Sequence, residues 1–418
     1  MYISDMDVPP MLLDLFRAYY DARRNKRTTE SALRFELDFE AQLFVLYEEL
    51  NTRTYRISPA TCFVVTKPVR REIFAGDFRD RVVHHLIYNY LAPLCERVFI
   101  FDSYACRVGK GTTCGIRRAD HFIRSVSRNY TRDCYTLKLD VSGYFMSIDR
   151  AILYEKMVAL VARYRGVVAW DADFLLWLLR VVIFHDHTAH CLMRGRPSDW
   201  DGLSASKSLF YAAPGCGLPI GNLTSQMFGN IYLNDFDHVA AALVPGARYG
   251  RYVDDMLFVG PDAQALARAI LTVGAYLHEK LALTPHPKKC VLQHYTKGVD
   301  FLGVSLRPGR IYVRHRIKCN IYRCVRSWNA RAATQSGVLA EEQVEALLAS
   351  LNSYLGALAP YRTRRLRRKV CSYLSDSLLR YVVPGRAFKR VRMRSNECGN
   401  PTECVKCTCK PPRGQGLE

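Results

Sequence analysis

The sequence predicts an α+β protein in which a mixed body is followed by a separate helical domain. Short strand-like runs, some alternating and some continuously apolar, are interleaved with longer segments whose apolar residues recur at helical spacing. From residue 306 to 394 the pattern is helical and basic. A length of 418 residues predicts two or three packed units, and 49% apolar residues are enough for a real core, which excludes wholesale disorder.

The first half of the chain alternates between these two patterns. Residues 8–50 have helical apolar spacing, and a short strand is expected from Thr61 to Thr66. Residues 78–100 are expected to form a helix that halts near Pro93. A strand that ends at Asp140 follows, and then come two helices and an irregular, Gly/Pro/Ser-rich insertion. These last three segments are expected at 150–163, 172–184 and 186–217.

The second half starts with a Gly/Pro loop, GLPIGNLTSQ, that leads into a helix. RYVDDMLFVG predicts two strands that meet at an acidic turn, and a helix is expected over about 262–281. Residues 299–313 predict a hairpin that turns at Pro308-Gly309. An apolar stripe between Val344 and Leu358 predicts the packed side of a helical bundle.

Positive charge is concentrated in the C-terminal part of the chain. The net charge is +21, and residues 305–394 contain 20 Lys and Arg against four acids, which leaves +16 in under a quarter of the chain. A single-sign field of this strength opposes compaction, and polyanion binding is its usual use. We therefore expect a nucleic-acid partner rather than a merely solubilising face, although charge does not distinguish RNA from DNA.

Membrane association and secretion are not expected. The sequence has no run of 18 apolar residues, and its N-terminus lacks a basic-then-apolar signal. The cysteines at 62, 95, 106, 114 and 134 are scattered singly in apolar stretches, where cysteine is usually a small buried hydrophobe of a reducing compartment. The cytoplasm is therefore the expected location.

Three carboxylates stand where strands end or turn. Asp140 closes the strand YTLKLD, and Asp254-Asp255 form the tip of the YVDD hairpin. Adjacent carboxylates repel each other unless a cation relieves the repulsion, and oxygen ligands suit Mg²⁺. Two such ions stabilise the attacking and leaving oxygens of a phosphoryl transfer. The alternative is an ordinary polar turn, because Asp is common in turns.

Seven collinear segments resemble the reverse transcriptase family over about residues 37–306. They are KPVRREIFAGDFRDRVVHHLIYNYL, SYACRVGKGT, LKLDVSGYFMSID, GLPIGNLTSQ, YVDD, LTPHPKKC and FLG. The resemblance implies a right-hand polymerase that copies template RNA into cDNA from dNTPs and holds the RNA–cDNA duplex. Its implied parts are an N-terminal helical extension (1–36), fingers and palm (37–305), a basic helical thumb (306–394) and a Cys-rich flexible tail (395–418).

The resemblance also implies roles for single residues. Asp140, Asp254 and Asp255 match the catalytic triad, which holds two Mg²⁺ ions, for which Mn²⁺ can substitute. The carbonyl of Val141 is an implied extra ligand. Phe145 matches the aromatic gate that rejects a 2′-OH, although the residue is equally suited to an apolar core.

Other implied contacts reach the triphosphate and the primer. Lys67 and Arg71 match residues that bind the triphosphate. Lys289 matches the lysine that protonates the leaving pyrophosphate, with Lys288 as the fallback; an exposed loop charge is the alternative. Phe301, Leu302 and Gly303 match the primer grip.

The fourth segment resembles the reverse transcriptases of diversity-generating retroelements. Ile220 and Gly221 are expected in the nucleotide pocket, where many relatives carry Gln before the glycine, and here the segment ends Ser225-Gln226. These enzymes make errors at template adenines and work with a small basic helical accessory protein. Because Ile makes no hydrogen bond, we hypothesise that Ile220 relaxes base selection; alternatively it packs the pocket of a faithful enzyme. Defence- or retron-type enzymes and an inactive RNA-binding scaffold are the competing classes.

Four cysteines crowd the C-terminus, at 398, 404, 407 and 409. Cys398, Cys404, Cys407 and Cys409 are enough for a tetrahedral Zn²⁺ site, but their spacing differs from the paired CxxC form. A zinc site and a basic tail with exposed thiols both remain open from the sequence.

Overall fold

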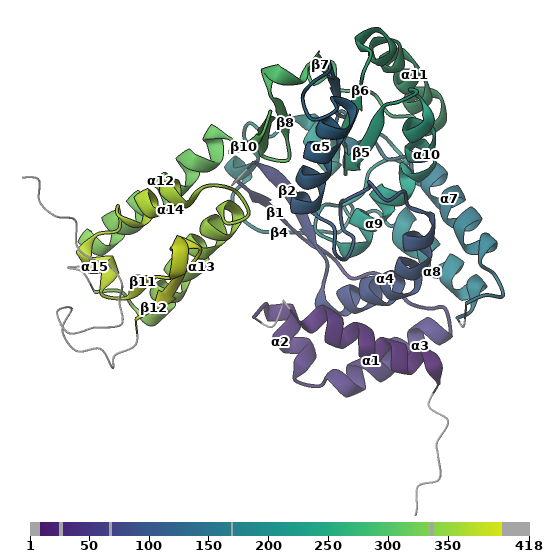
Figure 1. Ribbon diagram of the computed structural model, residues 1–418. Helices are drawn as coiled ribbons and strands as arrows, with labels where there is room; N and C mark the ends of the chain where they lie inside the picture. The colour runs from purple at the N-terminus through teal and green to yellow at the C-terminus, as the bar shows by residue number, and fades with distance from the viewer. Residues whose placement is uncertain (1–8, 25–27, 67–68, 169, 335–337, 395–418) are drawn as a thin grey trace, which may run out of the picture. The chain divides into compact units, whose positions relative to one another are not determined.

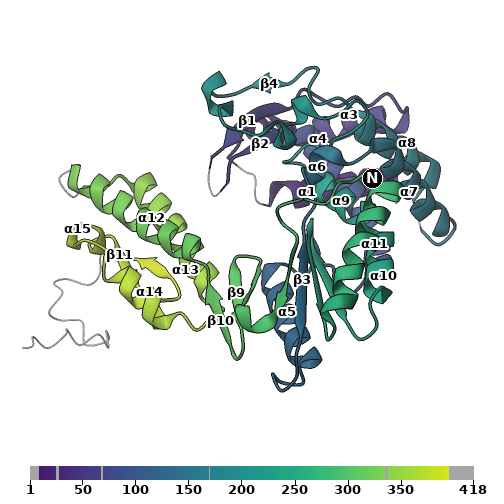
Figure 2. The same cartoon turned by 90° about the horizontal axis from the view of Figure 1, so that it is seen from above.

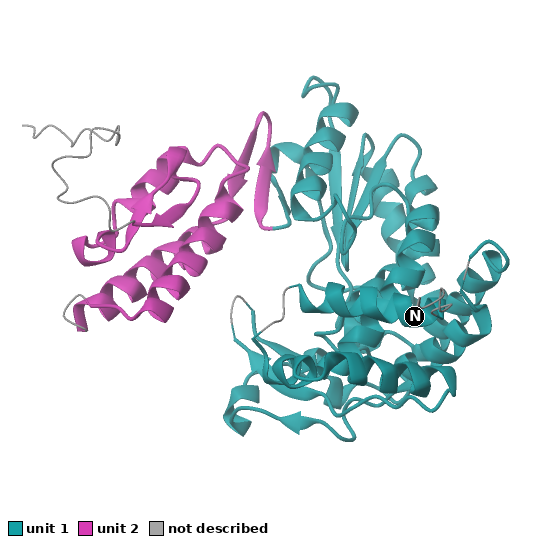
Figure 3. Ribbon diagram, turned by 90° about the horizontal axis from the view of Figure 1, so that it is seen from below, with its two compact units in different colours: residues 1–302 teal, residues 303–418 magenta. Residues whose placement is uncertain are grey.

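The computed structural model describes residues 9–24, 28–66, 69–168, 170–334 and 338–394. The chain divides into two compact units, residues 1–302 and 303–418 (Figures 1 and 3). The helices and strands of the first unit are α1 (Pro10–Arg23), α2 (Glu30–Glu36), α3 (Phe39–Asn51), β1 (Thr61–Val65), β2 (Arg71–Ala75), α4 (Phe78–Val98), α5 (Thr112–Val126), β3 (Tyr135–Leu139), α6 (Tyr144–Ser147), α7 (Arg150–Arg163), α8 (Ala172–Phe184), β4 (Leu192–Met193), α9 (Leu223–Tyr232), α10 (Asn234–Ala242), β5 (Arg248–Tyr252), β6 (Asp255–Gly260), α11 (Ala263–Leu281), β7 (Val291–His294) and β8 (Val299–Phe301).

Helices α1 to α3 pack on α4 through aromatic side chains. The ring of Tyr19 stacks on that of Phe39, with centroids 4.9 Å apart, and meets the edge of Phe78 at 6.1 Å. The helix expected over residues 78–100 corresponds to α4. The expectation that it halts near Pro93 is wrong, because α4 continues to Val98. Proline removes one backbone hydrogen bond, but Leu94 and neighbouring residues are buried, and this packing outweighs the local penalty.

A four-stranded antiparallel sheet in the order β5-β6-β3-β7 forms the centre of the first unit. In Figure 2, β3 stands between α5 and the pair α10–α11. Residues 256–259 of β6 are all buried, which agrees with helices on both faces of the sheet. The predicted strands of YTLKLD and RYVDDMLFVG are confirmed.

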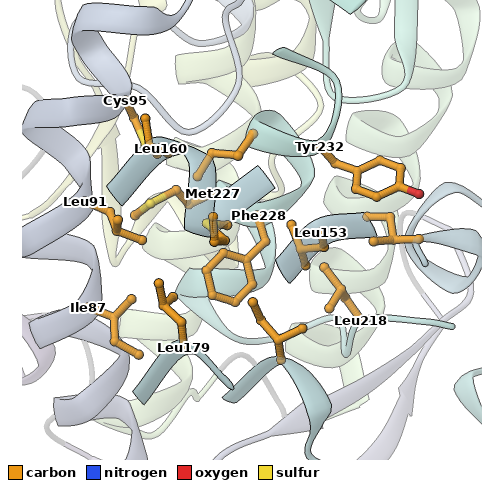
Figure 4. Close-up of a cluster of buried hydrophobic side chains, with 14 of the residues drawn as sticks. Ile87, Leu91, Cys95, Leu153, Leu160, Leu179, Leu218, Met227, Phe228 and Tyr232 are labelled. Carbon is orange, nitrogen blue, oxygen red and sulfur yellow. The ribbon is translucent and has the colours of Figure 1, made fainter. Parts of the chain in front are cut away.

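The hairpin β1–β2 is a second, smaller sheet, and β4 joins it parallel to β1. Strand β4 belongs to the predicted irregular insertion, residues 186–217, which otherwise contains short 3-10 turns. Helices predicted over 150–163 and 172–184 match α7 and α8. Between these helices, α4 and α9 lies the main core, part of which is drawn in Figure 4; it includes Leu153, Leu179 and Phe228.

The second unit contains helices and short strands. Its elements are β9 (Val304–Arg307), β10 (Arg310–Val313), α12 (His315–Thr334), α13 (Glu341–Leu358), α14 (Arg364–Cys371), α15 (Asp376–Leu379), β11 (Val382–Pro384) and β12 (Val391–Met393). The hairpin β9–β10 turns at Pro308-Gly309 as predicted, with Gly309 at φ 68°. The predicted apolar stripe packs α13 into a core with α12. The prediction of a purely helical segment is wrong, because β11 and β12 pair antiparallel.

Among the described helices, none combines the length and the apolar character that a membrane span requires.

Candidate active site

Asp140 lies directly after β3 and is held by the backbone of a neighbouring loop. The N–H of His286 donates to the Asp140 carbonyl at 2.7 Å, and the N–H of Ser142 donates to Thr284 at 2.9 Å. These two bonds flank Val141, whose own carbonyl takes part in neither of them. The backbone at Asp140 and Val141 is therefore fixed, while the carboxylate and the next carbonyl are the groups left for chemistry.

Asp254 and Asp255 come from the turn between β5 and β6. Tyr252 pairs with Asp255, so that Val253 and Asp254 form a two-residue hairpin loop. Val253 has φ 57°, a conformation that is strained for a β-branched residue. Because β6 pairs with β3, this turn lies at the same end of the sheet as Asp140.

The three carboxylates form one electrostatic group. Burial, followed by the negative charges of Asp140 and Asp255, raises the pKa of Asp254 to about 6. Such a shift is the physical signature of carboxylates that are crowded together without enough positive charge. The sequence-based expectation that these acids come together agrees with this coupling.

Two lysines partly neutralise the group. The Nζ of Lys289 lies 2.9 Å from both carboxylate oxygens of Asp140, and the Nζ of Lys138 lies 2.9 Å from Asp255 Oδ1. Within the described residues, no three His, Cys, Asp or Glu side chains are arranged as a ready-made metal site. The available donors are all hard oxygens, the set that suits Mg²⁺, and the raised pKa of Asp254 shows that further positive charge would be favourable. The site therefore fits a divalent cation.

A buried ion pair lies behind the hairpin turn, and sequence reasoning missed it. Arg251 and Asp237 are both fully buried, and Arg251 Nε donates to Asp237 Oδ1 at 2.7 Å. Nη1 of the same guanidinium donates to the Val253 carbonyl at 2.8 Å and to Asn230 Oδ1 at 3.2 Å. Tyr249 also donates to Asp237, at 2.8 Å. The sequence signal was an arginine in the predicted strand that leads into the acidic turn.

Phe145 and Ile220, predicted for the nucleotide pocket, share one apolar cluster. Both are half-buried and pack against a cluster that includes Phe74 and Met146. Leu218 donates its N–H to the Phe145 carbonyl at 2.8 Å, and Phe74 donates to the Ile220 carbonyl at 2.8 Å. The backbone of this pocket wall is therefore fixed from two sides.

Gly221 follows Ile220 and can only be glycine in this conformation. Its φ is 136°, and a Cβ there would lie 2.6 Å from the carbonyl oxygen of Phe74. The glycine thus permits the close approach of this loop to β2.

The remaining predicted residues are scattered. Arg71 is exposed at the start of β2, and Lys67 lies outside the described residues. Phe301 is buried at the end of β8, while Leu302 and Gly303 both have positive φ, at 47° and 86°. Lys288, the fallback for Lys289, is exposed, and its backbone N–H contacts His286. Cys398, Cys404, Cys407 and Cys409 lie outside the part of the chain that the structure describes.

One cysteine expectation is wrong. Cys106 is exposed rather than buried, and its Sγ lies 2.8 Å from Oε1 of Gln226 on α9. Cys106 has φ 54° in the loop between α4 and α5. The turn geometry, rather than apolar neighbours in the sequence, therefore decides its exposure.

Comparison with known proteins defines the class. The family described as "Reverse transcriptase (RNA-dependent DNA polymerase)" matches residues 66–306, which is more than half of the chain. The chain belongs to the reverse transcriptase family, and the predicted α+β, right-hand polymerase fold class is confirmed. A search of curated protein sequences finds no match.

Solved structures of telomerase are among those similar to the chain. Apo telomerase from Candida tropicalis has a TM-score of 0.45 at 11% identity, covering 78% of this chain and 56% of that one. Telomerase from Candida albicans with a fragment of telomeric RNA has a TM-score of 0.43 at 10% identity, covering 82% and 62%. The chain therefore spans about three fifths of the length of these telomerases.

Proposed function

We propose that the chain copies template RNA into cDNA, with Asp140, Asp254 and Asp255 as its catalytic carboxylates. The observation that carries this proposal is the coupled group of three acids at one end of the β5-β6-β3-β7 sheet, in a chain of the reverse transcriptase family. Carboxylates crowded in this way favour bound cations, and nucleotidyl transfer needs positive charge beside the reacting phosphate.

Asp140, Asp254 and the Val141 carbonyl would hold Mg²⁺, or Mn²⁺ in its place. When bound, two such ions neutralise charge on the phosphate and favour ionisation of the primer hydroxyl. A cation on Asp140 would compete with the Lys289 ammonium that pairs with this carboxylate, so that Lys289 would move away. This movement frees Lys289 for the proposed role of protonating the pyrophosphate. Lys138 remains beside Asp255, with its Nζ 2.9 Å from Oδ1.

Incoming dNTPs would bind between this pocket wall and the hairpin β1–β2, which belongs to the proposed fingers. In this proposal Phe145 closes the space that a 2′-OH would need, and Ile220 and Gly221 line the same wall. Arg71 and Lys67 bind the triphosphate, for which their positive charge is suited. Phe301, Leu302 and Gly303 hold the primer end, and the basic second unit binds the template–primer backbone.

The test is primer extension on a defined RNA template with Mg²⁺ and dNTPs. Asp254→Asn keeps the side-chain volume but removes a charge, so extension should fall by about 10³-fold or more. The matched control is Asp201→Asn, an exposed acid outside the site, which should behave like the unsubstituted protein. Extension that survives in Asp254→Asn would refute the catalytic assignment.

We further propose that copying is error-prone at template adenines, as in diversity-generating retroelements, with a small basic helical accessory protein as partner. Support comes from Ile220, an apolar residue in the pocket wall where a glutamine would make hydrogen bonds. Sequenced products should carry errors concentrated opposite adenines, and Ile220→Gln should reduce them. Faithful products would favour the defence- or retron-type enzyme instead, and an Ile220→Gln enzyme that stays equally error-prone would contradict the role of Ile220.

A further inference from the structure

A buried carboxylate on β2 has no part in the proposed chemistry. Glu72 is 1% exposed, and its Oε1 accepts from Trp200 Nε1 at 2.8 Å and from Ser208 Oγ at 2.9 Å. Its Oε2 accepts from the backbone N–H of Leu209 at 2.6 Å. All three donors belong to the insertion, residues 186–217. One fingers side chain thus binds the insertion at three points.

Burial of the Glu72 carboxylate carries a cost in free energy, which these hydrogen bonds must offset. Burying a carboxylate is unfavourable unless hydrogen bonds replace its water. Within the described residues no Lys, Arg or His lies within ion-pair distance of Glu72, so neutral donors alone satisfy it. Hydrogen bonds to a charged acceptor are about twice as strong as those between neutral groups. A glutamate at this position therefore binds the insertion more strongly than a glutamine would.

Further contacts tie the insertion to the same hairpin. Leu192 donates its N–H to Ala60 at 2.8 Å, which pairs β4 with β1. The ring of Phe210 lies 5.6 Å from that of Phe74 on β2. The insertion is therefore part of the fingers sheet rather than a free loop.

The insertion also contacts the wall of the proposed nucleotide pocket. A Cβ on Gly143, two residues before Phe145, would lie 2.6 Å from the carbonyl oxygen of Ser206, so these backbones touch. Leu209 belongs to the apolar cluster against which both Phe145 and Ile220 pack. Glu72 thus binds the backbone N–H of a residue that belongs to the cluster behind both pocket side chains.

We propose that Glu72 is a positioning residue for sugar selection. Through Leu209 it fixes the insertion as the backing of Phe145 and Ile220, and so sets the space left for the 2′ position of the nucleotide. This inference rests on the proposed polymerase function. Glu72 itself touches neither the catalytic carboxylates nor the reacting atoms, because its three bonds all go to the insertion.

The experiment compares incorporation of a dNTP with that of the matching rNTP, as the ratio of kcat/KM values. Glu72→Gln keeps the side-chain shape, but its NH₂ group must face an N–H or O–H donor, so one bond is lost and its donor is left unsatisfied. We expect the discrimination ratio to fall about tenfold, mainly through the KM values, since one such bond changes an equilibrium by roughly this factor. Ser208→Ala removes one donor while keeping the carboxylate, and should give a smaller fall in the same direction.

The matched control is Asp201→Asn, which changes an exposed acid of the same insertion and should leave the ratio unchanged. If Glu72→Gln does not fold, the discrimination ratio of Ser208→Ala tests the proposal by itself. The positioning role is overturned if the folded variants keep a dNTP/rNTP discrimination ratio within twofold of the original and lose only active fraction. The polymerase proposal would then remain intact. A wild-type chain that incorporates no nucleotide, even with a candidate small basic accessory protein added, would overturn both.

Discussion

At the scale of single residues, the candidate site is a balance of charge. Three carboxylates meet two ammonium groups: Asp140 pairs with Lys289 and Asp255 with Lys138, whereas Asp254 forms no ion pair within the described residues. Burial and its two acidic neighbours consequently raise the pKa of Asp254 to about 6. Added positive charge would therefore stabilise this group, which supports the proposed binding of cations.

The raised pKa predicts how stability depends on pH. A carboxyl group with a folded pKa of about 6 and an ordinary value of 3.8 favours folding in its protonated form. Its contribution is fully present below pH 3.8 and is lost as pH rises through 6. In metal-free protein at pH 7.5, Asp254→Asn should therefore increase the free energy of unfolding by about 1–3 kcal/mol.

Urea unfolding of metal-free protein between pH 4.5 and 7.5 checks this prediction. The variant should show a flatter dependence than the unsubstituted protein, while Asp201→Asn should not. Primer extension by the unsubstituted protein should fall in acid, because protonated Asp254 binds cations poorly, and the bound cation should move this fall to below pH 6. Identical pH profiles for Asp254→Asn and the parent would mean that this carboxyl is not perturbed.

Lys289 is predicted to compete with the cation. Lys289→Ala leaves Asp140 without its ammonium partner, so Mn²⁺ affinity, measured by calorimetry, should increase severalfold. Turnover should nevertheless fall by about 10²-fold or more if Lys289 protonates pyrophosphate. Lys280→Ala, a change at an exposed lysine of α11, is the control. Weaker Mn²⁺ binding in Lys289→Ala would contradict the competition.

At the scale of elements, the hairpin β5–β6 depends on helices α9 and α10. Arg251 joins Asp237 of α10 to Asn230 of α9 and to the carbonyl of Val253, whose positive φ needs support. Removing one partner of a buried ion pair leaves an uncompensated charge, so Arg251→Met should destabilise the protein by about 3–5 kcal/mol.

A combined variant separates stability from positioning. Arg251→Met with Asp237→Leu and Tyr249→Phe replaces the buried ion pair and the tyrosine that donates to it, and thermal unfolding should show most of the lost stability restored. Primer extension should stay low, because the Val253 carbonyl still lacks its donor and the turn with Asp254 is no longer held. Recovery of both properties together would show that Arg251 acts only through folding.

At the scale of the whole molecule, charge is segregated between the two units. Residues 305–394 carry +16 of the total +21, and helix α14 alone presents three exposed arginines, at 364, 365 and 368. If the second unit binds the template–primer backbone, each phosphate contact releases a counterion on binding.

Salt dependence measures those contacts. Changing Arg364, Arg365 and Arg368 to Gln should weaken template–primer binding at low salt and reduce the slope of log K against log salt by about 2–3. Fluorescence anisotropy with a labelled duplex gives both quantities. Arg17→Gln, an exposed arginine of α1, should leave the slope unchanged. An unaltered slope in the triple variant would show that these three arginines do not contact the nucleic-acid backbone.

Local patterns determined much of this protein. Strand β6, helices α7, α8 and α11 and the turn at Gly309 follow from periodicity and turn chemistry within a few residues. The ordered segments around Asp140 and the YVDD turn likewise predicted the family, because chemistry of this kind requires particular residue types at particular strand ends. These features depend on neighbours along the chain, which a sequence displays directly.

Other features depend on contacts between residues that lie far apart in the sequence. The pairing of Lys289 with Asp140, of Arg251 with Asp237, and of Glu72 with the insertion joins residues 14 to 149 positions apart. The course of α4 through Pro93 and the pair β11–β12 also depend on packing that local propensity does not contain. Burial and long-range partners set the energies of these features, and neither is defined until the chain has folded.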